Sequence, residues 1–364
     1  MEIQVSDLMD LATGAGFLGT GGGGDPYLGR LMLRQVLEEG CDLKIIELED
    51  LPDDALVVAS ACMGAPTVMV EKIPCVDAAE ASLRALERHM GRKADALICI
   101  EAGGVNGTLP LVLGARLGLP VVNGDGMGRA FPELQMVTFG VYGNSATPLV
   151  LAGEQGDCIV IEARSNRFSE NLARANVVAM GAIAQISLYP MNGKAVRQTC
   201  VPRTITLALE IGRTIQSARR GKTDPFAALQ RYFAGTSPAR CARVIFDGKI
   251  VDILRETKSG FAKGRVTLAG LDDASETMTV NFQNEFLLAI RDDRPVAMVP
   301  DLVVILDRET AEPITTESLK FGQRVKVMAV SVPDVMRTDA ALQTFGPAAF
   351  GIKHPYIRLE DCAT

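Results

Sequence analysis

Short, continuous runs of apolar residues mark the first 165 residues, and amphipathic stretches lie between these runs. The runs are rich in Val, Ile and Leu, which predicts buried strands. They cover Leu43–Leu48, Ala55–Ala61, Asp95–Glu101 and Leu119–Asn123. Stretches such as Asp77–Met90 and Gly107–Leu117 instead carry apolar residues at helical spacing. Because continuous apolar strands that alternate with helices are typical of a mostly parallel sheet with helices on both faces, we expect an α/β domain over residues 1–168.

The pattern changes after about residue 170. Residues 171–233 have helical periodicity, in segments that cover 171–185, 203–220 and 225–233. From Ala242 onward, strand-like runs recur roughly every ten residues, the spacing of an antiparallel barrel or sandwich. These runs are 264–269, 276–282, 285–291, 295–306 and 323–332. The sequence Phe246-Asp247-Gly248-Lys249 predicts an additional hairpin, since Asp-Gly suits a type I′ turn.

Together these patterns predict two domains joined by a helical connector. The second would occupy residues 169–364, with a helical segment at 171–233 and an antiparallel β-barrel at about 240–335. We expect the C-terminal tail, which contains Phe350, Tyr356 and Ile357, to return to the first domain. A chain of 364 residues is long enough for two or three domains and for a core that needs no disulfide or metal to fold.

The composition is that of a soluble globular protein, with 48% apolar and 22% charged residues. The chain holds 37 Lys and Arg against 44 Asp and Glu, a net charge of -7, without a run of basic residues. It has five Tyr and no Trp. A nucleic-acid-binding protein needs a positive surface and often stacks bases on aromatic side chains, so we expect no nucleic-acid partner.

The sequence also predicts no membrane partner and no export. The most apolar segments, 55–70 and 134–153, are interrupted by Gly, Pro or polar residues and fall short of about 18 clean apolar positions. The N-terminus has no basic and apolar leader, and the eight cysteines form no CxxC motif. Scattered cysteines in a chain without an export signal are typical of a reducing compartment, so we expect a cytoplasmic protein.

Glycine is concentrated between residues 14 and 24, directly before a helix start at Asp25-Pro26. The segment contains GxGxxG spacing, but the dinucleotide-binding motif requires a preceding strand, and an amphipathic helix is predicted here instead. Consecutive glycines allow positive φ angles and the close approach of another chain or a ligand, next to the unpaired N–H groups of a helix start. The candidate substrate-binding residues are therefore Gly21, Gly22, Gly23, Gly24 and Asp25. A tight buried turn between two packed helices is the alternative.

Two further polar loops follow predicted strands, at the edge where ligands bind in open α/β sheets. In the first loop, Glu101 is a candidate catalytic carboxylate and Asn106 a candidate substrate ligand. The second loop holds the candidate catalytic acid Asp125, together with Arg129 and Glu133, which we expect to bind substrate. The alternatives are a helix cap for Asn106, a solvated strand end for Glu101 and an Arg–Asp ion pair that braces the second loop. With the glycine segment, the two loops predict one shared pocket.

Candidate metal ligands are few. Two His exclude a His-rich zinc site, so a metal would depend mostly on carboxylate or Cys ligands. No cofactor is firmly indicated, and a divalent metal held by Asp125 and Glu101 is the open alternative. Cys62 lies at a predicted core strand and is expected to be an inert packing group, as is Cys99. Asn281, Asn284 and Glu285 interrupt strand-like runs, which predicts a hairpin turn.

Several of these segments resemble the hallmark motifs of the DUF917 family, which is named for S-methyl thiohydantoin desulfurase domains. The resemblance covers nearly the whole chain, and its Gly-rich and DGMGRAFPE segments are the most specific. In the first half it rests on Gly19–Tyr27, Met63–Thr67 with Glu71-Lys72, Glu101–Asn106 and Asp125–Met136. In the second half it rests on Phe282–Glu285, Val299–Leu302 and Phe345–Gly351.

The resemblance implies an N-terminal α/β domain, a C-terminal domain with a β-barrel, and hydrolysis of thiohydantoin- or hydantoin-type rings. We accordingly expect a hydrolase in which water attacks a ring carbon of a small cyclic amide or thioamide. Asp125 or Glu101 would act as the base or as a metal ligand. The Gly21–Gly24 amides would stabilise the developing anion, and Arg129 would hold a substrate carboxylate.

The sequence departs from the family pattern at two places. Asn123-Gly124 stands where an Asp-Ala pair is more usual before Asp125, and Ile352–Tyr356 replaces a more acidic ending. The missing acid motivates an alternative function, a non-catalytic subunit or small-ligand-binding protein that partners a hydantoinase/oxoprolinase-type enzyme. A nucleotide-dependent enzyme is a third interpretation. As partners we consider a small-molecule substrate, a hydantoinase/oxoprolinase-type enzyme and a second copy of the chain in a homo-oligomer.

Overall fold

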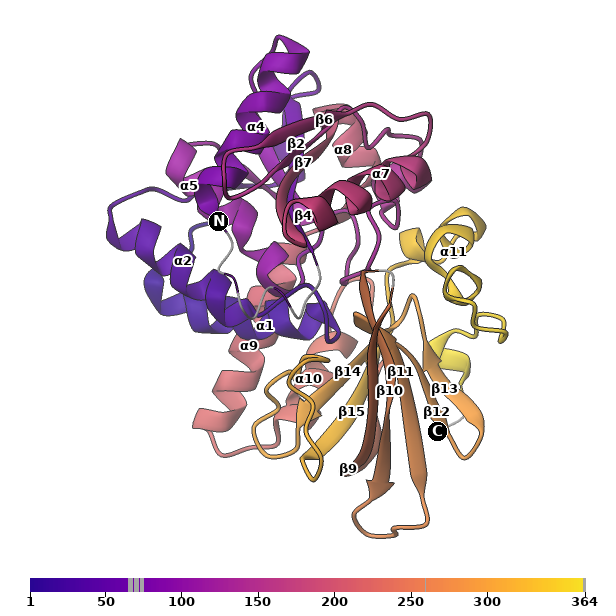
Figure 1. Cartoon of the computed structure of the whole chain (residues 1–364). Helices are drawn as coiled ribbons and strands as arrows, with labels where there is room; N and C mark the ends of the chain where they lie inside the picture. Colours follow the sequence, from indigo (N-terminus) through magenta and orange to yellow (C-terminus); the bar gives the residue numbers. More distant parts are fainter. Residues whose placement is uncertain (65–67, 69–71, 73–74, 259, 363–364) are drawn as a thin grey trace.

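The computed structural model describes the chain apart from residues 65–67, 69–71, 73–74, 259 and 363–364. It has two domains in contact, the first with a mixed sheet flanked by helices and the second with a curled antiparallel sheet (Figure 1). This architecture confirms the predicted combination of an α/β domain and a barrel-like β domain. Among the described residues, no helix combines the length and the apolarity needed to cross a membrane.

The first sheet has eight strands, in the order β1-β4-β3-β2-β7-β5-β6, with β8 paired to β4. Strands β1, β4, β3 and β2 are parallel to one another, as their continuous apolar runs predicted. The other strands run antiparallel to their neighbours. The bounds are β1 Ile45–Ile46, β2 Leu56–Gly64, β3 Ala96–Cys99, β4 Val121–Asp125, β5 Leu149–Ala152, β6 Cys158–Ile161, β7 Ile183–Asn192 and β8 Val201–Pro202.

Helices cover both faces of this sheet. Helices α4 and α5 pack on each other and on β2, while α7 lies over β2, β5 and β7 on the other face. Helix α9 packs along α1 and reaches β4, and α10 fills the space between α9 and β9 of the second domain. The bounds are α1 Leu8–Gly19, α2 Pro26–Glu38, α4 Val76–Met90, α5 Leu109–Leu117, α6 Thr138–Val141, α7 Asn166–Ala179, α8 Gly193–Thr199, α9 Thr204–Arg220, α10 Pro225–Ala234 and α11 Asp339–Phe345.

The second sheet has seven antiparallel strands in the order β13-β12-β11-β10-β9-β15-β14. It curls far enough that β14 at one edge contacts β12 and β13 at the other, which gives a half-barrel. The bounds are β9 Ala242–Lys258, β10 Phe261–Gly270, β11 Thr277–Gln283, β12 Glu285–Arg291, β13 Arg294–Met298, β14 Leu302–Asp307 and β15 Arg324–Val330. The tail beyond β15 packs on the first domain, where Phe345 stacks on Phe131 with ring centroids 5.0 Å apart.

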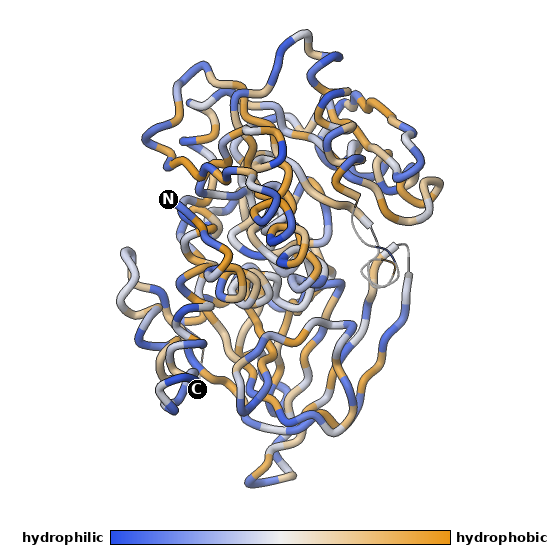
Figure 2. Tube along the Cα trace, turned by 90° about the vertical axis from the view of Figure 1, so that its left-hand side faces the viewer, coloured by the Kyte–Doolittle hydropathy of each residue, from blue (hydrophilic) through white to orange (hydrophobic). Residues whose placement is uncertain are grey.

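The hydrophobic core is continuous between the domains. Val58 and Leu97 of the first sheet belong to the same buried cluster as Val304 and Met328 of the second. A separate cluster around Phe286 fills the inside of the curled sheet. The hydrophobic tracts accordingly run through the middle of both domains (Figure 2). Because the shared cluster would be exposed to water if the domains separated, burial of apolar surface holds the two in a fixed relation.

The hairpin predicted at Asp247-Gly248 is wrong, since both residues lie inside the single strand β9. Gly248 is paired with Gly270 of β10 on one side and with Val325 of β15 on the other. A Cβ atom at Gly248 would lie 2.5 Å from the ring of Phe246, so packing within the sheet requires glycine at this position. Two partner strands therefore override the local preference of Asp-Gly for a turn.

The helical segment predicted at 171–233 is also wrong in part. Helix α7 ends at Ala179, and Ile183–Asn192 form β7 in the middle of the first sheet. Strand β7 has hydrogen-bond partners on both sides and mostly buried side chains, which outweigh the helical periodicity up to residue 185. The helices predicted at 203–220 and 225–233 are present as α9 and α10. The predicted strand 295–306 is divided into β13 and β14.

Candidate functional site

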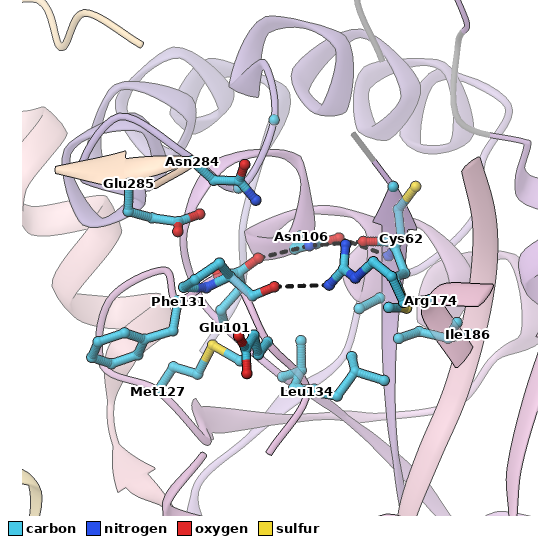
Figure 3. A pocket seen from close by; sticks show the side chains of 18 residues that line it. Cys62, Glu101, Asn106, Met127, Phe131, Leu134, Arg174, Ile186, Asn284 and Glu285 are labelled. Atoms are coloured by element: carbon cyan, nitrogen blue, oxygen red, sulfur yellow. Dashed lines mark hydrogen bonds between the residues drawn. The ribbon is translucent and has the colours of Figure 1, made fainter. Parts of the chain in front are cut away.

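A cavity of about 60 Å³ lies between the two domains, beyond the carboxyl ends of β2 and β3. The glycine segment, the loops after β3 and β4, helix α7 and the turn between β11 and β12 all contribute to its wall (Figure 3). The edge beyond the strand ends is where open α/β sheets bind ligands. Its polar lining residues are Glu101, Asn106, Glu133, Arg174, Asn284 and Glu285, with the backbone of Gly23 and Gly24.

The glycine segment forms part of the wall because its backbone lies against two other segments. Gly23 has a φ of +73°, and its carbonyl accepts a hydrogen bond from the N–H of Val105 at 2.8 Å. A Cβ atom at Gly22 would lie 2.1 Å from Oε1 of Glu285, so glycine is needed to leave room for that carboxyl group. Gly23 and Gly24 line the cavity, and their N–H groups donate to no acceptor within the described part of the chain. The segment thus combines tight packing with amides at the cavity.

Two buried carboxyl groups, one from each domain, meet at the cavity. Glu101 follows β3 and is 4% exposed, and Glu285 begins β12 and is 3% exposed. The Oε2 atom of each makes no hydrogen bond among the described residues. Burial, together with the charge of Asp125, raises the pKa of Glu101 to about 8. Burial and the charge of Glu101 raise the pKa of Glu285 well above its ordinary value. Two such groups favour a state in which they share one proton.

Asn106 fixes the position of Glu101. Its Nδ2 donates to Oε1 of Glu101 at 2.7 Å and to the carbonyl of Cys62 at 3.1 Å. Its Oδ1 accepts from the N–H of Cys62 at 2.7 Å. The amide therefore joins the end of β2 to the loop after β3, as the dashed lines in Figure 3 show. Neither proposed alternative, a helix cap at Asn106 or a solvated Glu101, describes this buried arrangement.

Asp125 is close to the cavity but does not line it. Its Oδ2 accepts from the N–H of Ala102 at 2.7 Å, and its Oδ1 accepts from the N–H of Gly128 at 2.9 Å. Burial raises its pKa to about 7. These bonds tie the loop that carries Glu101 to the loop after β4. This placement does not agree with the expected direct action of Asp125 on substrate, because backbone N–H groups already donate to both of its carboxylate oxygens.

Arg129 is fully buried and also lies outside the cavity lining. Its Nη1 donates to the carbonyl of Asp301 at 2.8 Å, and its Nη2 donates to the carbonyl of Phe286 at 2.8 Å and to Oγ1 of Thr20 at 2.7 Å. The guanidinium thus cross-links the two domains. This placement does not agree with the expected role of holding a substrate carboxylate, because its donors are already engaged. Its charge still lowers the pKa of Glu285 against the effect of burial.

Of the remaining predicted residues, Glu133 lines the cavity, whereas Gly21 and Asp25 do not. Glu133 lines the cavity, and its Oε2 accepts from Nη1 of Arg167 at 2.7 Å. Gly21 packs on Phe286, whose ring would lie 2.6 Å from a Cβ atom there. Asp25 is exposed and caps α2, with its Oδ1 accepting from the N–H of Tyr27 at 2.9 Å. Asp25 is therefore the helix cap that the sequence predicted and has no contact with the cavity.

Sequence reasoning missed three residues of the site. The sequence predicts only a turn at Asn284 and Glu285, and they do connect two strands, but the turn carries Glu285 into the cavity. Their only signal was the family segment Phe282–Glu285. Arg174 lies on α7, where its Nε donates to Oε1 of Glu170 at 2.6 Å and its Nη2 to the carbonyl of Pro132 at 2.9 Å. Figure 3 shows Arg174 on the side of the cavity opposite Glu285.

A thiolate or a metal ion is poorly supported at this site. Cys62 lines the cavity, but burial raises the pKa of its thiol to about 12, so it stays protonated at neutral pH. Within the described part of the chain, no group of three His, Cys, Asp or Glu side chains is placed to hold a metal ion. The expected ligand pair of Asp125 and Glu101 therefore lacks a third side chain, and the Asp125 oxygens already accept backbone hydrogen bonds.

Family models match the chain over nearly its whole length. The model described as S-Me-THD-like, N-terminal domain, matches residues 6–163, and the one described as S-Me-THD-like, C-terminal domain, matches residues 164–359. The protein belongs to the S-Me-THD-like family, DUF917. An X-ray structure of a protein from Chromobacterium violaceum is similar to it with a TM-score of 0.83 and 25% identity, over 99% of this chain and 100% of the other. No curated protein matches the sequence significantly.

The segments that carry the S-Me-THD-like resemblance converge on the cavity. Gly23 and Gly24, Glu101 and Asn106, the loop after Asp125, and Asn284 with Glu285 all come from them. The segment Met63–Thr67 with Glu71-Lys72 lies partly outside the described residues, and its first two residues line the cavity. The candidate site of this S-Me-THD-like chain is therefore lined by residues of both domains.

Proposed function

We propose that this S-Me-THD-like protein is a hydrolase of small cyclic amides or thioamides of the hydantoin or thiohydantoin type. The observation that carries the proposal is the pair of buried carboxyl groups of Glu101 and Glu285, each with one oxygen left without a partner in the described structure. Buried acids with raised pKa values in a cavity are typical of acid–base catalysis. The cavity volume of about 60 Å³ is far too small for a peptide or a dinucleotide.

The two carboxyl groups take different roles because they ionise in a fixed order. The charge of Glu101 raises the pKa of Glu285 more than Arg129 lowers it, whereas the pKa of Glu101 is raised to about 8, so Glu101 is the first of the two to ionise. Glu101 is then the general base, and Glu285, which keeps its proton, is the general acid. Asp125 and Asn106 are positioning residues, since they fix the backbone and the side chain of Glu101.

The reaction consumes one water for each ring. Glu101 removes a proton from water while the water oxygen bonds to the ring carbon that carries oxygen or sulfur. Glu285 donates its proton to the leaving atom as the bond from that carbon breaks, either to a ring nitrogen or to an exocyclic sulfur. An amide gives a carboxylic acid and an amine, and an S-alkyl ring gives a carbonyl group and a thiol. The proton taken up by Glu101 then passes to Glu285 and restores the pair.

The backbone of the glycine segment supplies the anion stabilisation. Gly23 and Gly24 line the same cavity and their N–H groups have no acceptor in the described structure, so we assign them as donors to the oxygen or sulfur that becomes negative when water attacks. Donors that are held rigidly before the reaction cost no reorganisation during it. The close packing of Gly22 against Glu285 keeps these amides and the general acid in a fixed relation.

The alternative of a non-catalytic subunit rested on Asn123. This residue lies outside the cavity, where its Nδ2 donates to both carboxylate oxygens of Glu47 and to Oγ1 of Thr206. An acid at position 123 would therefore not reach the Glu101–Glu285 pair. The position of Asn123 gives the subunit interpretation no support, and we place the activity in this chain itself.

The test is turnover of a panel of hydantoins, thiohydantoins and S-alkyl thiohydantoins, followed by chromatography of the products. We expect Glu101→Gln and Glu285→Gln each to lower kcat by at least about 100-fold, the usual contribution of a positioned acid or base. Glu87→Gln is the matched control, because Glu87 is also a buried carboxyl group but lies on α4 away from the cavity. If both cavity variants turn over the panel at the wild-type rate, or if the wild-type protein acts on none of these rings, the proposal is wrong.

A further inference from the structure

A second and much larger cavity, of about 860 Å³, opens on the other side of β4. It lies among the N-terminal end of α9, the end of α10, and the segments that precede and follow α11. Five arginines line it, Arg203, Arg231, Arg240, Arg337 and Arg358, against three acids, Glu210, Asp334 and Glu360. None of these residues belongs to the cavity of the Glu101–Glu285 pair.

Two of the three acids are paired with arginines, and one of these partners, Arg337, belongs to the same wall and also pairs with the buried Asp301. Oε1 of Glu210 accepts from Nη1 of Arg213 at 3.0 Å, and Oε1 of Glu360 accepts from Nη1 of Arg337 at 3.0 Å. The side chains of Arg231 and Arg358 are exposed and have no hydrogen-bond or ion-pair partner within the described structure. The cavity therefore presents an excess of positive charge in an otherwise acidic protein.

Arg240 adds a buried cation to this wall. It is 9% exposed, its Nε donates to the carbonyl of Ser331, and its guanidinium stacks on Phe233. Its Nη2 is buried without a hydrogen-bond partner among the described residues. A buried guanidinium with unused donors carries an unsatisfied desolvation cost unless an acceptor binds it. Nη2 of Arg240 is therefore a donor available to an anion in this cavity.

The start of α9 contributes a second set of donors. Arg203, at the N-cap, has a φ of +59° and provides no side-chain cap. The N–H of Thr206 is satisfied by Oδ1 of Asn123 at 3.2 Å, but those of Thr204 and Ile205 have no acceptor in the described structure. This helix has 17 residues, so its unpaired N–H groups and its dipole favour an anion at this end.

We propose that this cavity binds a small phosphorylated molecule. Arginine guanidinium groups and the N–H groups of a helix N-terminus can together donate to the several acceptor oxygens of a phosphate group. The volume is in the range that holds a ligand of nucleotide size, and Tyr232 supplies an aromatic surface for its organic part. This site is independent of the hydrolytic cavity, so that either proposal can fail without the other.

The test is a calorimetric titration of the intact protein with pyrophosphate and with adenosine monophosphate, and with citrate as a trianion that lacks phosphate. We expect both phosphates to bind, and the double variant Arg231→Gln/Arg358→Gln to weaken binding by about tenfold or more, or 1.4 kcal/mol. The matched control is Arg88→Gln/Lys93→Gln, which removes two exposed charges from a surface at the end of α4. Neither this control nor Glu101→Gln is expected to change the affinity by more than about twofold.

The proposal is overturned if neither phosphate binds at millimolar concentration, or if citrate alone binds. It is equally overturned if the arginine double variant binds as tightly as the wild type, or if the control double variant loses as much affinity. Loss of phosphate binding in Glu101→Gln would move the ligand to the other cavity and would also contradict it.

Discussion

The Glu101→Gln substitution tests the electrostatics of the cavity without reference to any substrate. Glutamine keeps the shape of the side chain and an oxygen that can accept the hydrogen bond from Nδ2 of Asn106. It removes the ability to ionise. The comparison between wild type and variant therefore isolates the protonation of one buried carboxyl group.

The sign of the effect follows from the raised pKa of Glu101. Its ordinary value is 4.5, and burial raises it to about 8 in the folded protein. Between these pH values the unfolded chain loses the proton and the folded chain keeps it, so the free energy of unfolding falls as the pH rises. The slope is at most about 1.4 kcal/mol per pH unit for one group, which amounts to a loss on the order of 4–5 kcal/mol by pH 8. The variant does not undergo this loss.

The assay is urea unfolding at pH 5, 6, 7 and 8. The wild type will lose stability across this range, because Asp125 and Glu285 have raised pKa values of the same origin and add to the slope. Glu101→Gln will lose less, and it will be the more stable protein at pH 8. Glu87→Gln controls for the loss of a buried carboxylate elsewhere, where Arg84 and the N–H of Ala94 donate to it. Parallel curves for wild type and Glu101→Gln would refute a raised pKa of Glu101, and with it the role of a general base poised near neutral pH.

Two further substitutions test the packing and the hydrogen bonds that hold the cavity in shape. Arg129→Met removes donors to Asp301, Phe286 and Thr20, and we expect a loss of about 3–5 kcal/mol in urea unfolding, whereas a loss below about 1 kcal/mol would contradict its role as a cross-link between domains. Gly22→Ala places a Cβ atom 2.1 Å from Glu285 and will lower kcat by roughly 100-fold with an unchanged circular dichroism spectrum. Gly153→Ala, which has no contact closer than 3.9 Å, is its control, and equal rates for the two would count against a fixed Glu285.

Local patterns predicted those parts of the fold in which local preference and tertiary environment agree. The continuous apolar runs predicted the parallel strands because both faces of these strands are covered. Asp25-Pro26 predicted the start of α2 because capping depends on a few adjacent residues. The hairpin prediction at Asp247-Gly248 was wrong for the opposite reason. The local preference of these two residues for a turn is weaker than the stabilisation that β9 gains by pairing with two neighbouring strands.

The sequence by itself determined the two-domain architecture and the loops that would meet, because periodicity and glycine content act over short distances along the chain. It also identified Glu101 and Asn106 as candidate site residues. Only the tertiary structure decided which carboxyl group Glu101 would face. Glu285 lies 184 positions further along, in a segment that has the local pattern of a plain turn. The curl of the second sheet, the shared core and the missing Cβ of Gly22 bring it to the cavity. The same packing engaged Arg129 and Asp125 with the backbone, because buried polar groups are satisfied by whichever partners the fold brings within reach.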